Sequence, residues 1–177
     1  MKLLAIQRTK GGQVRRHRRA TWLLAVGFAF PILVGAALAT PGVGVLSGTV
    51  HARGTLPEDI VVNSKSGVHL KTKGSADLVT QQLVLAGGGT TGWHSHPGPV
   101  LVTIKRGAIR VIYADAASCE GTVYEVGDSF VDRGDEVVHI ARNVSATDEV
   151  EFWATYIVPG VPAGPFRLDE PVAPSAC

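Results

Sequence analysis

Short apolar runs recur from about residue 59 to residue 160, and each is bounded by Gly, Pro, Asp or Asn. Val, Ile, Thr, Tyr and Phe are frequent within the runs, and these residue types are typical of strands. Closely spaced short strands predict an all-β fold, a sandwich or a barrel, and no segment here has the pattern of an amphipathic helix. We expect strands at 59–63, 67–72, 77–86, 99–107, 108–114, 122–128, 129–134, 136–143 and 150–160.

The N-terminal part of the chain has a different pattern. A basic cluster at 15–19 precedes an uncharged apolar run at 22–39, which ends in the small residues Ala37 and Ala39. This order is typical of a signal peptide, and we expect cleavage after Ala39. Because the run is at the short end of a bilayer span, an uncleaved anchor helix is the alternative. Either way, the basic flank predicts export across the cytoplasmic membrane, followed by secretion or by tethering on its outer side.

These patterns divide the chain into four segments. We expect a signal peptide or membrane anchor at 1–39, a linker or arm with a possible first strand at 40–66, a β-barrel at 67–160 and a proline-rich C-terminal tail at 161–177. The chain has two cysteines, Cys119 and Cys177. In an exported protein such a pair predicts a disulfide, which would attach the tail to the barrel, and two free thiols are the alternative.

The charge of the chain is also uneven. Seven of the 17 Lys and Arg residues lie before Thr40, whereas all 15 Asp and Glu residues lie after it. The part from Thr40 onward therefore carries ten basic and fifteen acidic side chains, a formal charge of −5. A mildly acidic domain lacks the basic surface that nucleic acids require, so we exclude nucleic acid as a partner. Membrane contact is expected only through the N-terminal segment.

Three of the six histidines suggest a metal site. His94 and His96 are two residues apart, so on a strand both side chains project from the same face. His139 lies in the apolar strand predicted at 136–143 and is the best third ligand. Imidazoles on one face can share one ion, at about 2.0 to 2.1 Å each for zinc. The alternative for His139 is a core histidine bonded to a backbone carbonyl, and for the pair a chance spacing.

Two segments resemble the conserved motifs of the cupins. "GWHSHPGPVLVTIKRG", residues 92–107, is similar to the first motif, and "GDSFVDRGDEVVHIARN", residues 127–143, is similar to the second. The resemblance implies a double-stranded β-helix, or jelly-roll, barrel that holds a metal inside through His94, His96 and His139. It also implies that Asn143 is a turn residue, and it makes a homodimer a family-based expectation.

The sequence departs from the cupin pattern in two places. Val100 and Leu101 stand where the family has a glutamate ligand, and the second motif lacks its usual proline, with Gly134 in the turn. Three neutral histidines suit a divalent transition metal, namely iron, zinc, copper or nickel, better than hard cations that prefer oxygen ligands.

Other polar side chains on the predicted strands are candidates to support the site. Gln81 and Gln82 are adjacent on one strand, so one of them faces inward by alternation. Tyr113 and Tyr156 could donate a hydrogen bond to a bound oxygen species. A purely packing or solvated role is the alternative for each of the four.

The sequence therefore predicts an exported protein that binds a divalent transition metal through three histidines and presents it to a small molecule. A metal-dependent oxidoreductase of dioxygenase type is one alternative, because three ligands leave open positions on the ion. A metal-free structural or ligand-sensing barrel is another, because one fold serves many functions.

Overall fold

The computed structural model describes residues 41–160, 164–171 and 173–174, and all of the regular structure in them is β-strand. Each of the predicted strands is present, so the all-β class is confirmed. No helix among the described residues is long and apolar enough to cross a membrane. The strands are β1 (Val43–Leu56), β2 (Val61–Asn63), β3 (His69–Lys71), β4 (Ala76–Thr90), β5 (His94–Ser95), β6 (Val100–Arg106), β7 (Ala108–Tyr113), β8 (Thr122–Glu125), β9 (Ser129–Asp132), β10 (His139–Asn143), β11 (Val150–Pro159) and β12 (Leu168–Asp169).

Three predictions concern residues outside this range. The signal peptide or anchor at 1–39 and its cleavage after Ala39 lie outside the described residues. The same holds for Cys177, so its disulfide with Cys119 stays a prediction.

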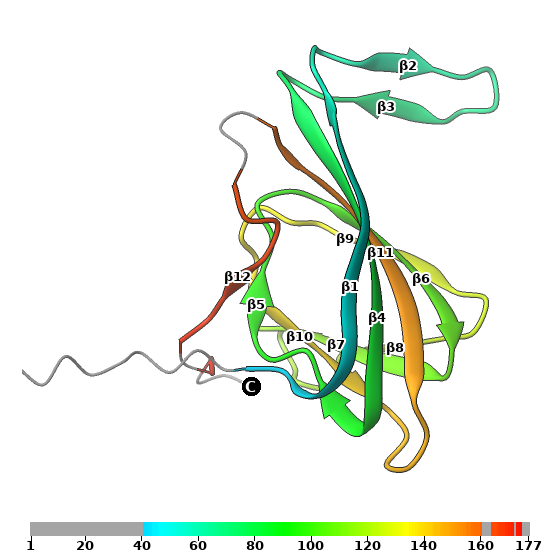
Figure 1. Ribbon diagram of the computed structural model, residues 1–177, viewed down its shortest axis with the longest axis vertical. Coiled ribbons are helices and arrows are strands. Elements are labelled where there is room, and N and C mark those ends of the chain that lie inside the picture. The colour runs from blue at the N-terminus through cyan, green and yellow to red at the C-terminus, as the bar shows by residue number, and fades with distance from the viewer. Residues whose placement is uncertain (1–40, 161–163, 172, 175–177) are drawn as a thin grey trace, which may run out of the picture. The chain divides into compact units, whose positions relative to one another are not determined.

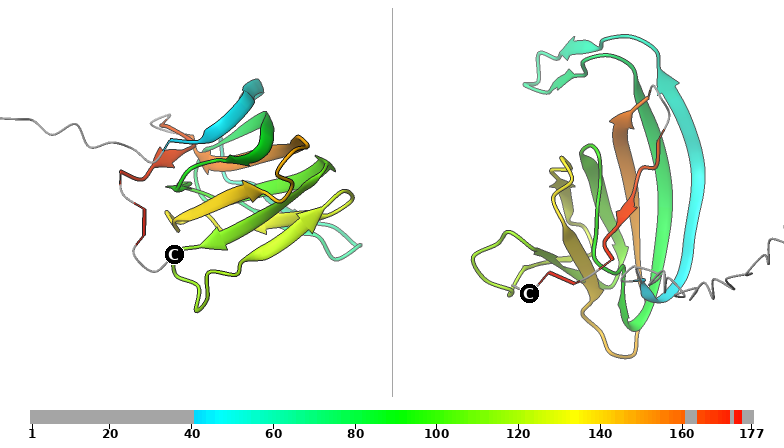
Figure 2. Two further views of the ribbon diagram at one scale, coloured as in Figure 1. Left: turned by 90° about the horizontal axis from the view of Figure 1, so that it is seen from below. Right: turned by 90° about the vertical axis from the view of Figure 1, so that its left-hand side faces the viewer.

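The strands form a near-closed antiparallel barrel with two layers (Figures 1 and 2). One layer has the order β1-β4-β11-β6-β9, and the other has the order β12-β5-β10-β7-β8. The layers meet where Thr90 at the end of β4 pairs with Arg142 of β10. Because β5 and β10 are neighbours in the second layer, the two histidine motifs lie side by side although they are far apart in the sequence.

β1 occupies much of the segment that the sequence suggested as a linker or arm. It pairs antiparallel with β4 from Val43 opposite Thr90 to Leu56 opposite Ala76, with irregularities in register on the way. The possible first strand is thus present, and for these residues the linker interpretation is wrong. The small and glycine-rich composition hid it, because most of its side chains are exposed and show no apolar alternation.

The short strands β2 and β3 form a separate hairpin that extends beyond one end of the barrel (Figure 1). All six of their residues are exposed. His69 lies in this hairpin, where its Nδ1 is 2.7 Å from Oδ1 of Asn63. This exposed histidine is not among the three that are grouped inside the barrel.

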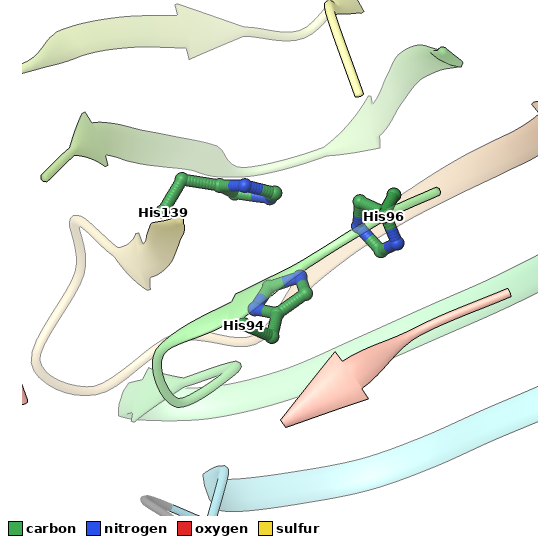
Figure 3. A group of neighbouring side chains, drawn as sticks. All are labelled: His94, His96 and His139. Atoms are coloured by element: carbon green, nitrogen blue, oxygen red, sulfur yellow. The ribbon is translucent and has the colours of Figure 1, made fainter. Parts of the chain in front are cut away.

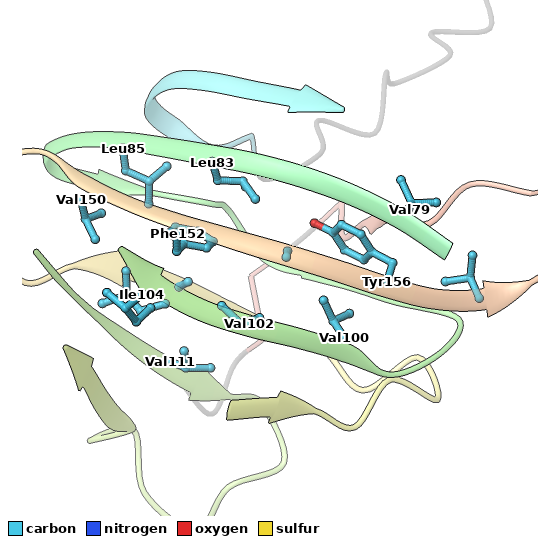
Figure 4. Packing of buried hydrophobic residues seen from close by; sticks show 14 residues of the cluster. Val79, Leu83, Leu85, Val100, Val102, Ile104, Val111, Val150, Phe152 and Tyr156 are labelled. Atoms are coloured by element: carbon cyan, nitrogen blue, oxygen red, sulfur yellow. The ribbon is translucent and has the colours of Figure 1, made fainter. Parts of the chain in front are cut away.

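The core fills the space between the two layers. Leu85 on β4 and Phe152 on β11 point into it and pack with side chains from β6 and β7 (Figure 4). The buried positions alternate along β11 and β6, as expected for strands with one face toward the core. The cluster comprises Val79, Leu83, Leu85, Val100, Val102, Ile104, Ile109, Val111, Ala141, Val150, Phe152, Ala154, Tyr156 and Val158.

We expect the Leu85→Ala variant to lose about 2 to 5 kcal/mol of unfolding free energy, because the side chain is fully buried and its removal leaves a cavity. Denaturant unfolding of the purified protein measures this loss. The Leu101→Ala variant is the matched control, since Leu101 is 46% exposed and a change of at most about 0.5 kcal/mol is expected. Equal losses in the two variants would contradict the assignment of the core.

Candidate metal centre

The structure brings the three predicted histidines together inside the barrel (Figure 3). His94, His96 and His139 are all buried, and their candidate ligand atoms lie within 4.8 Å of one another. The ring centroids of His94 and His139 are 4.3 Å apart, and those of His94 and His96 are 4.8 Å apart. Two nitrogens bound to one ion at 2.0 to 2.1 Å are at most about 4.2 Å apart, so a small adjustment of the rings would accommodate an ion.

Strand register explains why these side chains meet. His139 on β10 pairs directly with His94 on β5, and on its other side it pairs with Tyr113 on β7. Directly opposed residues in antiparallel strands have side chains on the same face of the sheet. His96 follows β5 at the next position of the same parity, so its ring points to the same interior.

Backbone carbonyls fix the orientation of all three rings. Nδ1 of His94 is 2.8 Å from the carbonyl oxygen of Gly92, and Nδ1 of His96 is 2.7 Å from that of Phe166. Nδ1 of His139 is 3.2 Å from that of Val137. A carbonyl oxygen can only accept, so Nδ1 carries the hydrogen in each ring. Nε2 of each ring then carries an unshared lone pair and has no hydrogen-bond partner among the described residues. This is the form in which a neutral histidine binds a metal.

The rings are held in the neutral form. Burial lowers the pKa of His96 to about 4, and burial likewise lowers the pKa of His139. The pKa of His94 falls well below 6.5, first because of burial and then because of the nearby His139 and Arg167. Unfolded histidines take up protons below pH 6.5 that the folded metal-free protein does not. The metal-free protein should therefore lose stability as the pH falls from 6.5 toward the folded pKa values.

We expect metal affinity to survive mild acid. At pH 5.5, a histidine with an ordinary pKa of about 6.5 is protonated in about ten molecules for every one in which it is neutral. Three such histidines would reduce the metal affinity by about 10³-fold relative to pH 7.5. Because the three pKa values are lowered here, Co²⁺ affinity at pH 5.5 should stay within about tenfold of its value at pH 7.5. Titrations at the two pH values test this, and a thousandfold drop would contradict it.

A carboxylate that the sequence did not single out lies beside the histidines. Asp132 at the end of β9 is buried, and its Oδ2 is 3.2 Å from Nδ1 of His139. The same oxygen accepts a hydrogen bond of 3.1 Å from the hydroxyl of Tyr113, and Oδ1 accepts one of 2.8 Å from the backbone N–H of Gly134. Both carboxylate oxygens are therefore engaged, and Asp132 holds His139 in place from behind.

The turn between β9 and β10 locks Asp132 to the first histidine motif. Gly134 adopts a left-handed conformation with φ +68°, and a Cβ at this position would lie 2.2 Å from the backbone carbon of Gly98. Only glycine permits so close an approach. The N–H of Glu136 also donates to the carbonyl of His96 at 2.9 Å. Gly134 thus lies in the turn that lacks the proline of the cupin motif, and the contacts of this turn connect the two motifs directly.

Val100 and Leu101 occupy the position at which the resemblance to the cupins would place a glutamate ligand. Val100 is buried and faces the interior, whereas Leu101 points outward. Val100 is, however, the cross-strand partner of Asp132 in the β6–β9 pair. A carboxylate thus reaches the same region of the barrel from the neighbouring strand.

The other four predicted side chains divide into an inner and an outer set. Gln81 accepts a hydrogen bond of 2.7 Å from the hydroxyl of Tyr156, whose ring lies 5.1 Å from that of His96. Tyr113 supports Asp132, as described above. Gln82 instead donates to Glu151 at 2.7 Å, in a polar cluster apart from the histidines. Gln81 is therefore the inward residue of the pair, and Gln82 has no role at the site.

The C-terminal segment 164–171, which we call the strap, is part of the site although the sequence placed it in a separate tail. Its strand β12 pairs with β5, with Leu168 opposite Ser95 and Asp169 opposite His94. The strap also supplies the Phe166 carbonyl that orients His96. Arg167 of the strap lines the interior cavity. No sequence motif marked this segment, because its most direct contact with the histidines is made by a backbone atom.

A small cavity of about 40 Å³ lies between the histidines and the core. Both polar and apolar side chains line it. The polar lining consists of Thr91, His94, His96, Asp132, His139, Tyr156 and Arg167. A volume of this size holds an ion with a water molecule or one small chemical group.

No family model and no curated protein matches the chain significantly. A cupin-like protein from Thermotoga maritima MSB8 is 22% identical over 52% of this chain and 64% of its own, with a TM-score of 0.43. A double-stranded β-helix domain protein from Klebsiella pneumoniae is 22% identical over 65% of this chain and 87% of its own, with a TM-score of 0.42. An oxalate oxidase is 20% identical over 51% of this chain and 45% of its own, with a TM-score of 0.39. Two of these three structures are named for the cupin and double-stranded β-helix folds that the two motifs resemble. All three TM-scores are below 0.5, so these structures assign neither a family, a reaction nor a metal to this chain.

Proposed function

We propose that this chain is an exported protein whose barrel binds a divalent transition metal ion through His94, His96 and His139 and presents it to a small molecule. The observation that carries the proposal is the shared orientation of the three buried rings, each with Nδ1 bonded to a carbonyl and Nε2 left for an ion. Neutral imidazoles suit iron, zinc, copper or nickel. Three such rings facing one cavity favour a metal-binding barrel over a metal-free one.

The surroundings of the site favour binding over turnover. General acid–base catalysis needs a group within reach whose pKa is near the working pH. The hydroxyls of Tyr113 and Tyr156 already donate to Asp132 and Gln81, and burial raises the pKa of both tyrosines further above neutrality. A dioxygenase-type oxidoreductase is the second candidate, because three protein ligands would leave open coordination positions on a bound ion.

Elemental analysis of the full chain, purified without added metal, tests the proposal. We expect about one transition metal ion per chain. A protein that contains none, and that takes up none of Fe²⁺, Zn²⁺, Cu²⁺, Ni²⁺ or Mn²⁺, would favour the metal-free barrel. Oxygen consumption by the iron- and copper-loaded protein then separates the remaining candidates, since a binder consumes no oxygen above the rate of the free ions.

Export is supported by the basic and apolar pattern of residues 1–39. The intact mass of the exported protein tests it. A chain that begins at Thr40 indicates a cleaved signal peptide, and a full-length chain in the membrane fraction indicates an anchor.

A further inference from the structure

We propose that Arg167 binds the carboxylate of a small organic anion at the entrance to the metal cavity. The inference rests on the proposed metal site and adds to it the chemical class of the ligand. It starts from the position of Arg167 in the strap, which the function described so far does not use.

The strap holds Arg167 at a fixed position beside the ligands. On one side of it, the carbonyl of Phe166 accepts the hydrogen bond from His96 at 2.7 Å. On the other, Leu168 and Asp169 pair with β5, and the N–H of Glu170 donates to the carbonyl of Trp93 at 3.0 Å. Both flanks of Arg167 are thus bound to the segment that carries His94 and His96.

Arg167 stands between two spaces. The inner one is the metal cavity of about 40 Å³, and the outer one is a groove of about 270 Å³ between β1, β4 and the strap. Leu83, Thr91 and Arg167 line both of them. Of the described residues around either space, Arg167 is the only lysine or arginine. A ligand that enters from the groove toward the histidines therefore passes this guanidinium.

Part of the guanidinium is free to bind. Nη2 donates to the carbonyl of Thr91 at 2.7 Å, and Nε donates to Oδ1 of Asp169 at 2.6 Å. Nη2 is also 2.6 Å from the same oxygen of Asp169, so the two side chains, which both line the groove, form an ion pair. Arginine has five N–H donors, and those of Nη1 meet no acceptor among the described residues. The charge of Arg167 also reaches the site, because it contributes to the lowered pKa of His94, His96 and His139.

The charge balance of the site selects an anion. Val100 replaces the usual carboxylate ligand, so a divalent ion held by three neutral imidazoles keeps its full charge. Asp132 offsets one unit of this charge, and Asp169 forms an ion pair with Arg167, so the site with a bound divalent ion keeps a net charge of about +1. An anionic group is attracted by this remaining charge and can accept hydrogen bonds from the free Nη1 donors of Arg167. The inner cavity admits one small group, and the rest of the ligand would occupy the groove.

The test uses the full chain loaded with Co²⁺, whose visible absorption changes when a ligand binds the metal. Acetate serves as the anionic probe and imidazole as the neutral one. In the Arg167→Gln variant we expect the Kd for acetate to rise roughly 10- to 100-fold, because a charge-assisted hydrogen bond is lost. The Kd for imidazole and the affinity for Co²⁺ should change by less than about threefold. The Arg106→Gln variant, which removes an exposed arginine paired with Glu149, should behave as wild type.

Three results would overturn the inference. The acetate affinity could be unchanged in Arg167→Gln, the affinity for imidazole could fall as much as that for acetate, or wild-type protein with bound Co²⁺ could fail to bind acetate. The second result would mean that Arg167 only anchors the strap. Failure of the proposed function is distinguishable from all three, because in that case wild-type protein binds no Co²⁺ at all.

Discussion

The His139→Ala variant is expected to lose stoichiometric metal. Structural zinc sites with four ligands bind with roughly 10 to 16 kcal/mol, or about 3 kcal/mol per ligand, so one lost ligand lowers affinity on the order of 10²- to 10³-fold. The loss should be at the upper end here, because His139 is one of only three candidate ligands and pairs directly with His94 across the strands. Competition with a chelator of known affinity measures the change.

Two further variants make this result interpretable. His94→Ala should lose metal to the same extent, since it removes an equivalent ligand. His69→Ala removes an exposed histidine on β3 and should keep the metal. Because the His139→Ala substitution also removes a neighbour of buried Asp132, denaturant unfolding must show that the variant folds. A folded His139→Ala protein with a full complement of metal would refute the site.

The Asp132→Asn variant is expected to lower metal affinity 10- to 100-fold without removing a ligand, which is the usual effect of losing a carboxylate behind a ligating histidine. The asparagine oxygen can still accept from Gly134. The new NH₂ group, however, would face the N–H of His139 and the hydroxyl of Tyr113. Both of these groups donate to Asp132, and an NH₂ group cannot accept from them. The imidazole then loses its negative neighbour and one of the two acceptors beside its Nδ1–H, the other being the carbonyl of Val137.

A change in the Co²⁺ absorption spectrum would show that Asp132 acts on the metal and does more than support the fold. Asp59→Asn is a suitable control, because Asp59 is exposed and accepts only from the backbone of Gly74 in the hairpin region. Unaltered Co²⁺ affinity and spectrum in a folded Asp132→Asn protein would show that this carboxylate has no influence on the ion.

The sequence pattern predicted most of the barrel and the three histidines. The strands of β-branched and aromatic residues were found where their apolar runs lie, and alternation placed His94 and His96 on one face. Both results follow from local rules, since a strand presents every second residue to the core. These rules did not identify the full length of β1, because its apolar side chains are sparse and mostly exposed.

The surroundings of the histidines depend on contacts that are distant in the sequence. Asp132 shares the parity of Phe130 on β9, and this inward position was the one available signal for it. Its partners, Tyr113 and His139, become neighbours only through the order of β7 and β10 in the sheet. The Phe166 carbonyl had no signal, because any residue presents the same backbone oxygen.

The pairing of Val100 with Asp132 affects how such proteins are classified. A linear motif scores each position by itself, so a valine in place of a glutamate reads as the loss of an acidic group. In the folded barrel a carboxylate lies at the directly opposed position of the adjacent strand, behind a candidate metal ligand. Searches for metal sites in β-barrels should therefore score pairs of positions across the sheet, so that an acidic group on a neighbouring strand is not overlooked.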